Sequence, residues 1–206
     1  MFEKTLIPNA KKYLEILGRS GLLSNFYLAG GTGLALQLGH RISEDFDFFT
    51  TIDFTPRNFS SDLSKIFKFQ EKQTSKGTLI GSINGIRFSL FNYDYPLIYP
   101  AVEYLSLKIA DIRDIAAMKI DTIGSRGMKR DFIDLYYICR FGYELNFLFK
   151  IYEKKYHTSS PSITHLKKSL IYFEDADSDQ MPRMIKNIKW SDVKDWYKKE
   201  IIKLAN

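Results

Sequence analysis

The hydrophobic pattern of this chain changes near residue 100, and this change limits the folds that the chain can adopt. Before that point, short apolar runs alternate with turns, and Asn84-Gly85 joins the runs at 78–83 and 86–92, which predicts a β-hairpin. Beyond it, apolar residues recur at spacings of three and four, which predicts helices. We expect these helices over residues 102–123, 129–141, 144–156, 163–173 and 181–204.

The two patterns together predict an α+β protein. Residues 1–100 are expected to form an α/β core, and residues 101–206 are expected to form a helical part that packs against this core. No internal repeat and no long linker separates the two parts in the sequence. We therefore expect one functional unit.

Composition and charge narrow the class of protein. The 206 residues are 45% hydrophobic and 26% charged, which is typical of globular proteins and not of disordered or fibrous ones. No apolar run approaches the roughly 18 residues of a membrane-spanning helix, and the N-terminal residues lack the apolar segment of a signal peptide. We therefore expect a cytoplasmic protein without membrane contact. The net charge of +6 favours a polyanionic partner such as RNA.

A pair of glycines lies where the first buried strand is expected to end. Gly30-Gly31 follows the short apolar run 26–29, and a helix capped by Thr32 is predicted from there to Leu38. Without side chains, the pair lets a ligand approach the backbone, and the start of the helix offers unpaired N–H groups and the positive end of a dipole. The pattern thus fits a phosphate-binding loop, although a simple tight turn has the same appearance.

Two acids follow in the next predicted strand. Asp45 and Asp47 alternate with aromatic residues over 45–49, so their side chains are expected on the same face of the strand, about 6.6 Å apart. Two such carboxylates repel each other unless a cation lies between them or both face water. Mg²⁺, or Mn²⁺ in its place, suits this pair, because Mg²⁺ takes one or two carboxylates together with substrate phosphates. The alternative is an edge strand whose solvent face simply carries acids.

The glycine pair and the acids together describe a reaction. The start of the helix would hold a triphosphate and the two aspartates would hold the metal ion. A hydroxyl group would then attack the α-phosphate, and pyrophosphate would leave.

Residues 28–50, LAGGTGLALQLGHRISEDFDFFT, resemble the signature of the AbiEii/AbiGii toxin family of nucleotidyltransferases. Residues 115–137 and 172–182 resemble two further blocks of that family, so the resemblance extends over nearly the whole chain. It implies a nucleotidyltransferase-like fold of the polymerase-beta type, with a mixed sheet, flanking helices and a helical C-terminal half. It also implies a toxin of a type IV toxin–antitoxin or abortive-infection system, with a nucleoside triphosphate (NTP) as substrate, tRNA as acceptor and an antitoxin encoded nearby as partner.

The same resemblance implies the site residues: nucleotide contacts from Gly30, Gly31 and Thr32, metal ligands at Asp45 and Asp47, and an active centre completed by Lys119 and Asp134. Arg126 follows Lys119 by seven residues, so both would lie on nearly the same helix face and reach a triphosphate. The alternative for Lys119 is a side chain that lies along the helix with its ammonium group in water. Asp131, near a predicted helix start, is expected only to complement the helix dipole.

The sequence does not identify the residue that acts as general base. Polymerase-like nucleotidyltransferases commonly carry a third acid on a later strand, and the predicted strand 86–92 has Ser89 at that place, with Asp94 as the nearest acid. Asp134 or Asp94 would then act as base, or the enzyme would work with two carboxylates, or this copy would be catalytically weakened.

Three functions follow from these observations. The first is transfer of a nucleoside monophosphate from an NTP to a macromolecular acceptor, with tRNA favoured by the resemblance and by the positive charge. The second is a catalytically degenerate module of the same fold that binds a nucleotide or a protein, which a missing third acid would allow. The third is nucleotidylation of a small molecule, as in antibiotic inactivation.

Overall fold

A mixed β-sheet forms the centre of the first part of the molecule. Within the residues that the computed structural model describes, 1–157 and 162–204, the sheet has seven strands in the order β3-β4-β5-β2-β1-β7-β6. Their bounds are β1 Tyr27–Leu28, β2 Phe46–Thr50, β3 Phe69–Ser75, β4 Thr78–Ile83, β5 Ile86–Asn92, β6 Val102–Tyr104 and β7 Leu107–Ile109. The central strand β2 runs parallel to β5 and antiparallel to β1.

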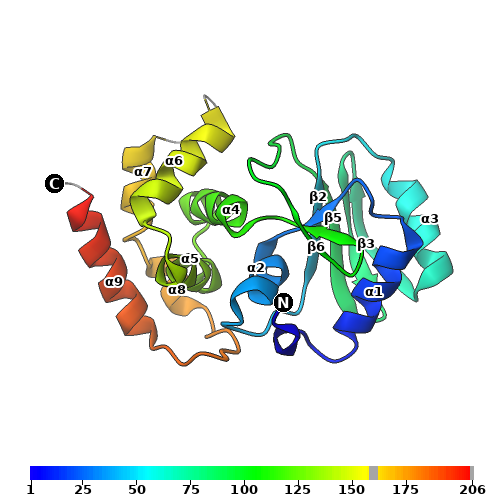
Figure 1. The fold of residues 1–206 in the computed structure, drawn as a ribbon, viewed down its shortest axis with the longest axis horizontal. Coiled ribbons are helices and arrows are strands. Elements are labelled where there is room, and N and C mark those ends of the chain that lie inside the picture. The colour runs from blue at the N-terminus through cyan, green and yellow to red at the C-terminus, as the bar shows by residue number, and fades with distance from the viewer. Residues whose placement is uncertain (158–161, 205–206) are drawn as a thin grey trace.

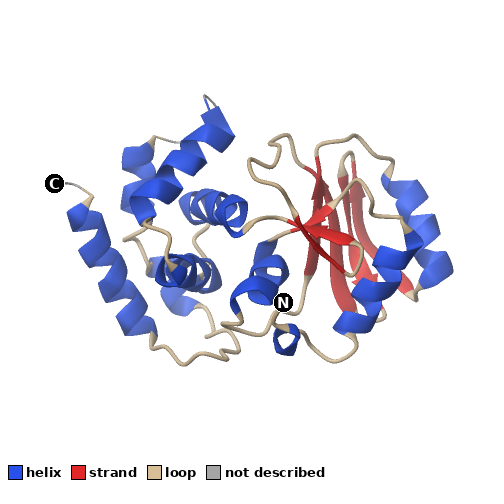
Figure 2. Ribbon diagram, viewed as in Figure 1, coloured by secondary structure: helices blue, strands red, loops and turns tan. Residues whose placement is uncertain are grey.

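Helices flank the sheet and then form a part of their own (Figures 1 and 2). The first three are α1 Ala10–Ser20, α2 Gly30–Leu38 and α3 Pro56–Ile66, preceded by a short 3₁₀-helix at Glu3–Thr5. The later ones are α4 Ile112–Ser125, α5 Lys129–Phe141, α6 Leu145–Tyr156, α7 Ile163–Ser169, α8 Glu174–Ser178 and α9 Trp190–Lys203. The predicted α+β fold with a helical C-terminal region is therefore confirmed.

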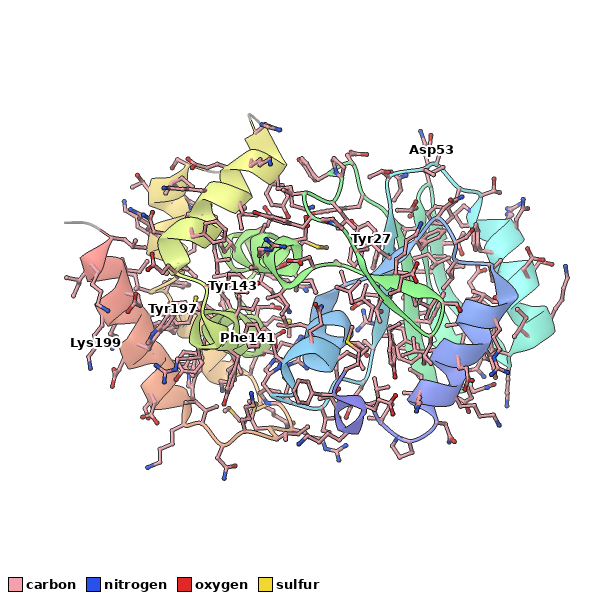
Figure 3. The ribbon with its side chains drawn as sticks, viewed as in Figure 1. Tyr27, Asp53, Phe141, Tyr143, Tyr197 and Lys199 are labelled. Atoms are coloured by element: carbon pink, nitrogen blue, oxygen red, sulfur yellow. The ribbon has the colours of Figure 1, made fainter. Side chains whose placement is uncertain are left out.

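The two faces of the sheet are covered differently. Helices α1 and α3 pack on one face, where Phe46 and Phe48 of β2 join a core with Leu14 and Leu63. Helices α2 and α4 lie on the other face, between the sheet and the remaining helices. Figure 3 shows Tyr27 of β1 on this second side. Because side chains alternate along a strand, β2 directs Asp47 and Phe49 toward the helical part.

The hairpin predicted at Asn84-Gly85 is confirmed. Strands β4 and β5 pair antiparallel on either side of it, with Ile83 opposite Ile86. Asn84 and Gly85 both adopt positive φ angles, 48° and 88°, as a two-residue hairpin turn requires.

The helix predicted over 102–123 is wrong in its first part. Strands β6 and β7 occupy residues 102–109, and the helix begins at Ile112. Leu107 and Ile109 are buried while Lys108 between them is exposed, which is the alternation of a strand. This three-residue alternation was too short to stand out beside the helical pattern that follows it.

The last two predicted helices also begin or end elsewhere. The segment predicted as a helix over 163–173 ends at Ser169, and residues 174–178 form the separate helix α8. The helix predicted from 181 begins only at Trp190. Pro182 lacks a backbone donor and disfavours helix in the residue before it. The backbone there pairs with the turn after α2 instead, since Ile42 N donates to Arg183 O at 2.8 Å and Ile185 N to His40 O at 2.9 Å.

None of the helices formed by residues 1–157 and 162–204 combines the length and the apolar character that crossing a membrane requires.

Helix α1 and the turn between β6 and β7 touch at a glycine. A Cβ atom placed on Gly18 would overlap the backbone carbonyl group of Leu105 in that turn. A Cβ atom placed on Gly124 of α4 would meet only the end of the Leu166 side chain, which can rotate away.

We predict that Gly18→Ala lowers the free energy of unfolding by about 1–3 kcal/mol, because the backbone must shift to relieve the overlap. Gly124→Ala is the matched control, since it also adds one methyl group to a glycine inside a helix, and helix propensity partly offsets its contact. Urea unfolding of both variants measures the difference. Equal stability of the two variants would contradict the packing described for α1.

Candidate active site

A cleft of about 880 Å³ lies where the sheet and α2 face α4 and α5. Most of the site residues predicted from the sequence line it: Gly30, Gly31, Asp45, Asp47, Lys119 and Arg126. Thr32 and Asp134 are buried beside the cleft and do not form its wall. The structure thus brings together residues from the sheet and from the helical part that lie far apart in the sequence.

Asp47 lies against the first residue of α2. The helix begins at Gly30, which has a φ of 59°, a value that favours glycine. A Cβ atom at this position would lie 3.2 Å from Asp47 Oδ2, and the backbone N–H of Ala29 donates to the carbonyl oxygen of Asp47 at 3.1 Å. The residue before the helix, Ala29, provides no side-chain cap. The Asp47 carboxylate therefore lies beside the N-terminus of α2, which has no side-chain cap.

The environment of Asp47 disfavours its negative charge. Burial raises the pKa of Asp47, and the charge of Asp45 raises it further, while Ser89, Arg87 and Lys119 lower it to a smaller extent. The side chain is half-buried and lines the cleft. A cation bound to both aspartates would remove this cost.

The donor set fits a divalent cation that also binds substrate. In the described part of the chain, no cluster of three or more His, Cys, Asp or Glu residues forms a complete protein site for a metal ion. Asp45 and Asp47 supply two carboxylates, and Mg²⁺ commonly binds one or two carboxylates and completes its shell with water and phosphate oxygens. The geometry suits an ion that arrives together with a triphosphate.

Thr32 does not cap α2, so this prediction was wrong. The helix begins two residues earlier, and the Thr32 side chain is buried within its first turn. The hydroxyl group of Thr32 donates to the backbone carbonyl of Asp45 and shares a hydrogen bond of 2.9 Å with Ser43 Oγ. Thr32 thereby fixes the chain just before β2, where Asp45 lies.

Asp134 is the centre of a buried network of charges. Its carboxylate is fully buried and accepts two hydrogen bonds from Arg41, from Nε at 2.7 Å and from Nη2 at 2.8 Å. His40 Nε2 lies at 2.8 Å and Lys119 Nζ at 2.6 Å from the same carboxylate. Burial alone would raise the pKa of Asp134, but Arg41, Lys119 and the hydrogen bond with His40 outweigh it and hold the pKa well below its usual value. A carboxylate so held does not accept a proton at neutral pH.

Arg41 is a site residue that the sequence analysis missed. Its guanidinium group lies directly beside the second glycine, because a Cβ atom at Gly31 would come within 2.5 Å of Arg41 Nη2. The sequence places His40 and Arg41 in a polar turn, and nothing local marks the arginine as buried. The buried partner, Asp134, is 93 residues away in the chain.

Lys119 faces the cleft between two acids. Its Nζ lies 2.7 Å from Asp131 Oδ1 and 2.6 Å from Asp134 Oδ2, and only 6% of the residue is exposed. Burial would lower the pKa of Lys119, but Asp131 and Asp134 outweigh it and raise the pKa. The alternative of a lysine with its ammonium group in water is therefore wrong.

Asp131 has a larger part in the site than the helix-dipole role predicted for it. It lines the cleft, and its second oxygen, Oδ2, is buried without a hydrogen-bond partner among the described residues. A buried carboxylate oxygen without a partner is uncommon in proteins, so it marks Asp131 as a candidate functional residue.

Ser89 lies directly opposite Asp47 in the parallel register of β2 and β5. Its hydroxyl group is fully buried and makes no hydrogen bond with the described residues, although it is near enough to Asp47 to lower the pKa of that acid. The place expected for a third acid is therefore held by a serine. Asp94, the nearest acid in the sequence, is exposed and does not line the cleft.

Arginines surround the mouth of the cleft. Arg126 is exposed, and Arg130 Nη1 lies 4.0 Å from Asp45 Oδ2. Arg87 of β5 and Arg183, in the segment before α9, also line the cleft. Positive side chains from the sheet, from α4 and α5 and from the C-terminal segment thus meet at one opening.

Comparisons with known proteins place this geometry in context. The family described as "Nucleotidyl transferase AbiEii toxin, Type IV TA system" matches residues 12–96 and 80–197. An uncharacterized protein of Aquifex aeolicus (strain VF5) is 38% identical over 205 residues, which cover 96% of this chain and 97% of that protein.

Two solved structures share the fold. The nucleotidyltransferase toxin MenT4 of Mycobacterium tuberculosis H37Rv superposes with a TM-score of 0.57 at 13% identity, over 96% of this chain and 86% of that chain. JHP933 from Helicobacter pylori gives a TM-score of 0.54 at 14% identity, over 96% of this chain and 92% of that chain. At such low identities the likeness concerns the fold.

We predict that Asp134→Asn destabilises the protein by about 3–5 kcal/mol at pH 7, because Arg41 and Lys119 lose a buried negative partner. The folded-state pKa of Asp134 is depressed, so the carboxylate stabilises the fold above about pH 4 and this stability is lost as the pH falls through the folded pKa. Urea unfolding between pH 7 and pH 3 should therefore show a weaker acid dependence in the variant. An unchanged acid dependence would contradict the depressed pKa.

Proposed function

The chain belongs to the AbiEii family of nucleotidyltransferase toxins, and on that premise we propose that it transfers a nucleoside monophosphate from an NTP to tRNA. The observation that carries the proposal is the position of the Asp47 carboxylate beside the glycine that begins α2, with Lys119 in the same cleft. An anion-binding helix start, a metal-binding acid and a buried cation are the groups that phosphoryl transfer requires.

Each group has a distinct task in the proposed reaction. The first N–H groups of α2 donate to triphosphate oxygens, and Lys119, oriented by Asp131 and Asp134, balances the negative charge of the same triphosphate. Asp45 and Asp47 hold Mg²⁺ or Mn²⁺, which when bound supplies Lewis-acid stabilisation of the phosphate oxygens. Arg126 contacts the triphosphate from the mouth of the cleft.

The transfer step breaks one bond and forms another. A hydroxyl oxygen of the acceptor forms a bond with the α-phosphorus, the bond from that phosphorus to the bridging oxygen breaks, and pyrophosphate leaves. The hydroxyl proton needs an acceptor. Asp131 suits this task better than Asp134, because Asp131 lines the cleft and keeps one oxygen without a partner among the described residues, whereas both oxygens of Asp134 are already engaged by cations.

The arginines around the cleft support a polyanionic acceptor. Arg87, Arg126, Arg130 and Arg183 belong to the mouth of the cleft, and an acceptor such as tRNA places phosphates beside such side chains.

The buried serine opposite Asp47 favours a second candidate, a degenerate module that binds a nucleotide without turnover. The two candidates differ in one measurement, the incorporation of labelled nucleotide into RNA.

We predict that the wild-type protein incorporates label from an α-³²P-labelled NTP into total tRNA when Mg²⁺ is present, and that Asp47→Asn reduces the rate by about 100-fold or more. The loss is expected because the variant holds the metal with one carboxylate instead of two. Asp94→Asn is the matched control, since Asp94 is exposed and outside the cleft. Absence of incorporation with all four nucleotides and with the wild-type protein would favour the degenerate module.

We also propose that the chain is a toxin whose activity is restrained by an antitoxin encoded nearby. Expression of the wild-type chain alone should then arrest bacterial growth, and co-expression of the neighbouring open reading frame should restore it. Asp47→Asn should not arrest growth. Arrest by both chains alike would show that the toxicity does not arise from nucleotide transfer.

A further inference from the structure

One end of the cleft is aromatic. Phe49 follows Asp47 by two residues on the same face of β2, and Phe91 lies opposite Phe49 on β5. The two ring centroids are 5.3 Å apart, and the ring of Tyr93 lies 5.5 Å from that of Phe49. All three side chains line the cleft and are half-buried. We refer to Phe49, Phe91 and Tyr93 as the aromatic end.

The aromatic end lies one strand step from the proposed metal site. Two residues along a strand span about 6.6 Å, so Phe49 lies about that far from Asp47 along β2. A triphosphate held at Asp47 and at the start of α2 would place its nucleobase near these rings.

A carboxylate without a cation lies at the same end. Asp121 of α4 lines the cleft, is half-buried and accepts a hydrogen bond of 3.2 Å from Tyr152 Oη. Among the described residues it forms no ion pair, whereas the buried acids Asp114, Asp131 and Asp134 each have a lysine partner. Burial raises the pKa of Asp121, and the hydrogen bond from Tyr152 only partly lowers it.

The surroundings of Asp121 hold it in place. Tyr152 belongs to α6, and its ring packs on Tyr156, whose hydroxyl group is hydrogen-bonded to that of Tyr93. The segment after Tyr93 is fixed by Asp114, which accepts the backbone N–H groups of Ile98 and Tyr99. Asp121 and the aromatic end are thus connected through Tyr152 and Tyr156, and Asp121 is half-buried without a cationic partner among the described residues.

We propose that the aromatic end is the nucleobase subsite and that Asp121 selects bases that carry an exocyclic amino group at the position of cytosine N4 and adenine N6. This inference rests on the proposed function and assigns its nucleotide preference. The rings stack on any base, because every base has a π-face. The carboxylate accepts an N–H from the amino group N4 of cytosine or N6 of adenine, whereas uracil and guanine present the carbonyl oxygens O4 and O6 at the corresponding position and are repelled.

Binding of the four nucleotides tests this selection. With the wild-type protein and Mg²⁺, calorimetric titration should give dissociation constants for CTP and ATP that are about tenfold or more below those for UTP and GTP, since a hydrogen bond to a charged acceptor is lost with UTP and GTP. In Asp121→Asn, the amide offers a donor to the uracil carbonyl as well as an acceptor, so the ratio of the UTP and CTP constants should fall by about tenfold.

Three further variants separate recognition of the base from stacking and from folding. Phe91→Ala should weaken binding of all four nucleotides by about tenfold while leaving their ratios unchanged. Tyr152→Phe keeps the acid and removes only the hydroxyl that orients it, so it should lower the ratio of the UTP and CTP constants to a smaller extent than Asp121→Asn. Asp94→Asn, a carboxylate-to-amide change outside the cleft, should change neither affinities nor ratios.

The outcomes distinguish this inference from the proposed function. If the wild-type protein transfers nucleotides but binds all four equally, or if Asp121→Asn changes every affinity by the same factor, the role of Asp121 is overturned and the transferase function stands. If the wild-type protein binds none of the four, both fall. If the ratios change as expected while Asp47→Asn retains full transfer activity, the base subsite stands and the proposed reaction centre falls.

Discussion

The arrangement of the site depends on the buried ion pairs of the Asp134 carboxylate. It lies on α5 and binds Arg41 from the turn after α2 and Lys119 from α4, so one buried charge joins the sheet-bearing part to the helical part. A buried carboxylate costs several kcal/mol unless its partners are held in good geometry. The same partners form the cleft, because Arg41 lies beside Gly31 and Lys119 faces Asp131. The charge balance of the interior therefore fixes the positions of the residues that line the cleft.

The alternation of β2 explains how one short strand serves both the core and the cleft. Phe46 and Phe48 are buried against α1 and α3, and this anchors the strand in one register. A shift by one residue would bury Asp47 and expose both phenylalanines, so the hydrophobic face secures the position of the acid. Parallel pairing with β5 then sets Ser89 opposite Asp47 and Phe91 opposite Phe49. The charged and the aromatic ends of the cleft thus follow from one register.

The sequence revealed those parts of the site that are local along the chain. The glycine pair and the two acids lie within eighteen residues of each other, and their spacing alone indicated a helix start beside a carboxylate pair. Arg41 and Asp134 were not linked in this way, because their contact spans 93 residues and no periodicity records it. The same limit applies to the tyrosines. Only the structure separates Tyr93, which lines the cleft, from Tyr95, which packs on Tyr156, and from Tyr99, which lies under Arg113.

The charged residues of the cleft differ in how far their charges are compensated, and this difference bears on how the site works. At the charged end, Lys119 and Arg41 are paired with acids, so their positions are set before any ligand arrives and little reorganisation accompanies binding. Asp47 and Asp121 instead keep an uncompensated charge, each half-buried and each with a raised pKa caused first by burial. A cation relieves the first and an amino group relieves the second. Burial therefore destabilises the anionic form of both acids, and ligand binding relieves this destabilisation. A metal-bound nucleotide whose base carries the amino group relieves both acids, whereas one without the amino group relieves only Asp47.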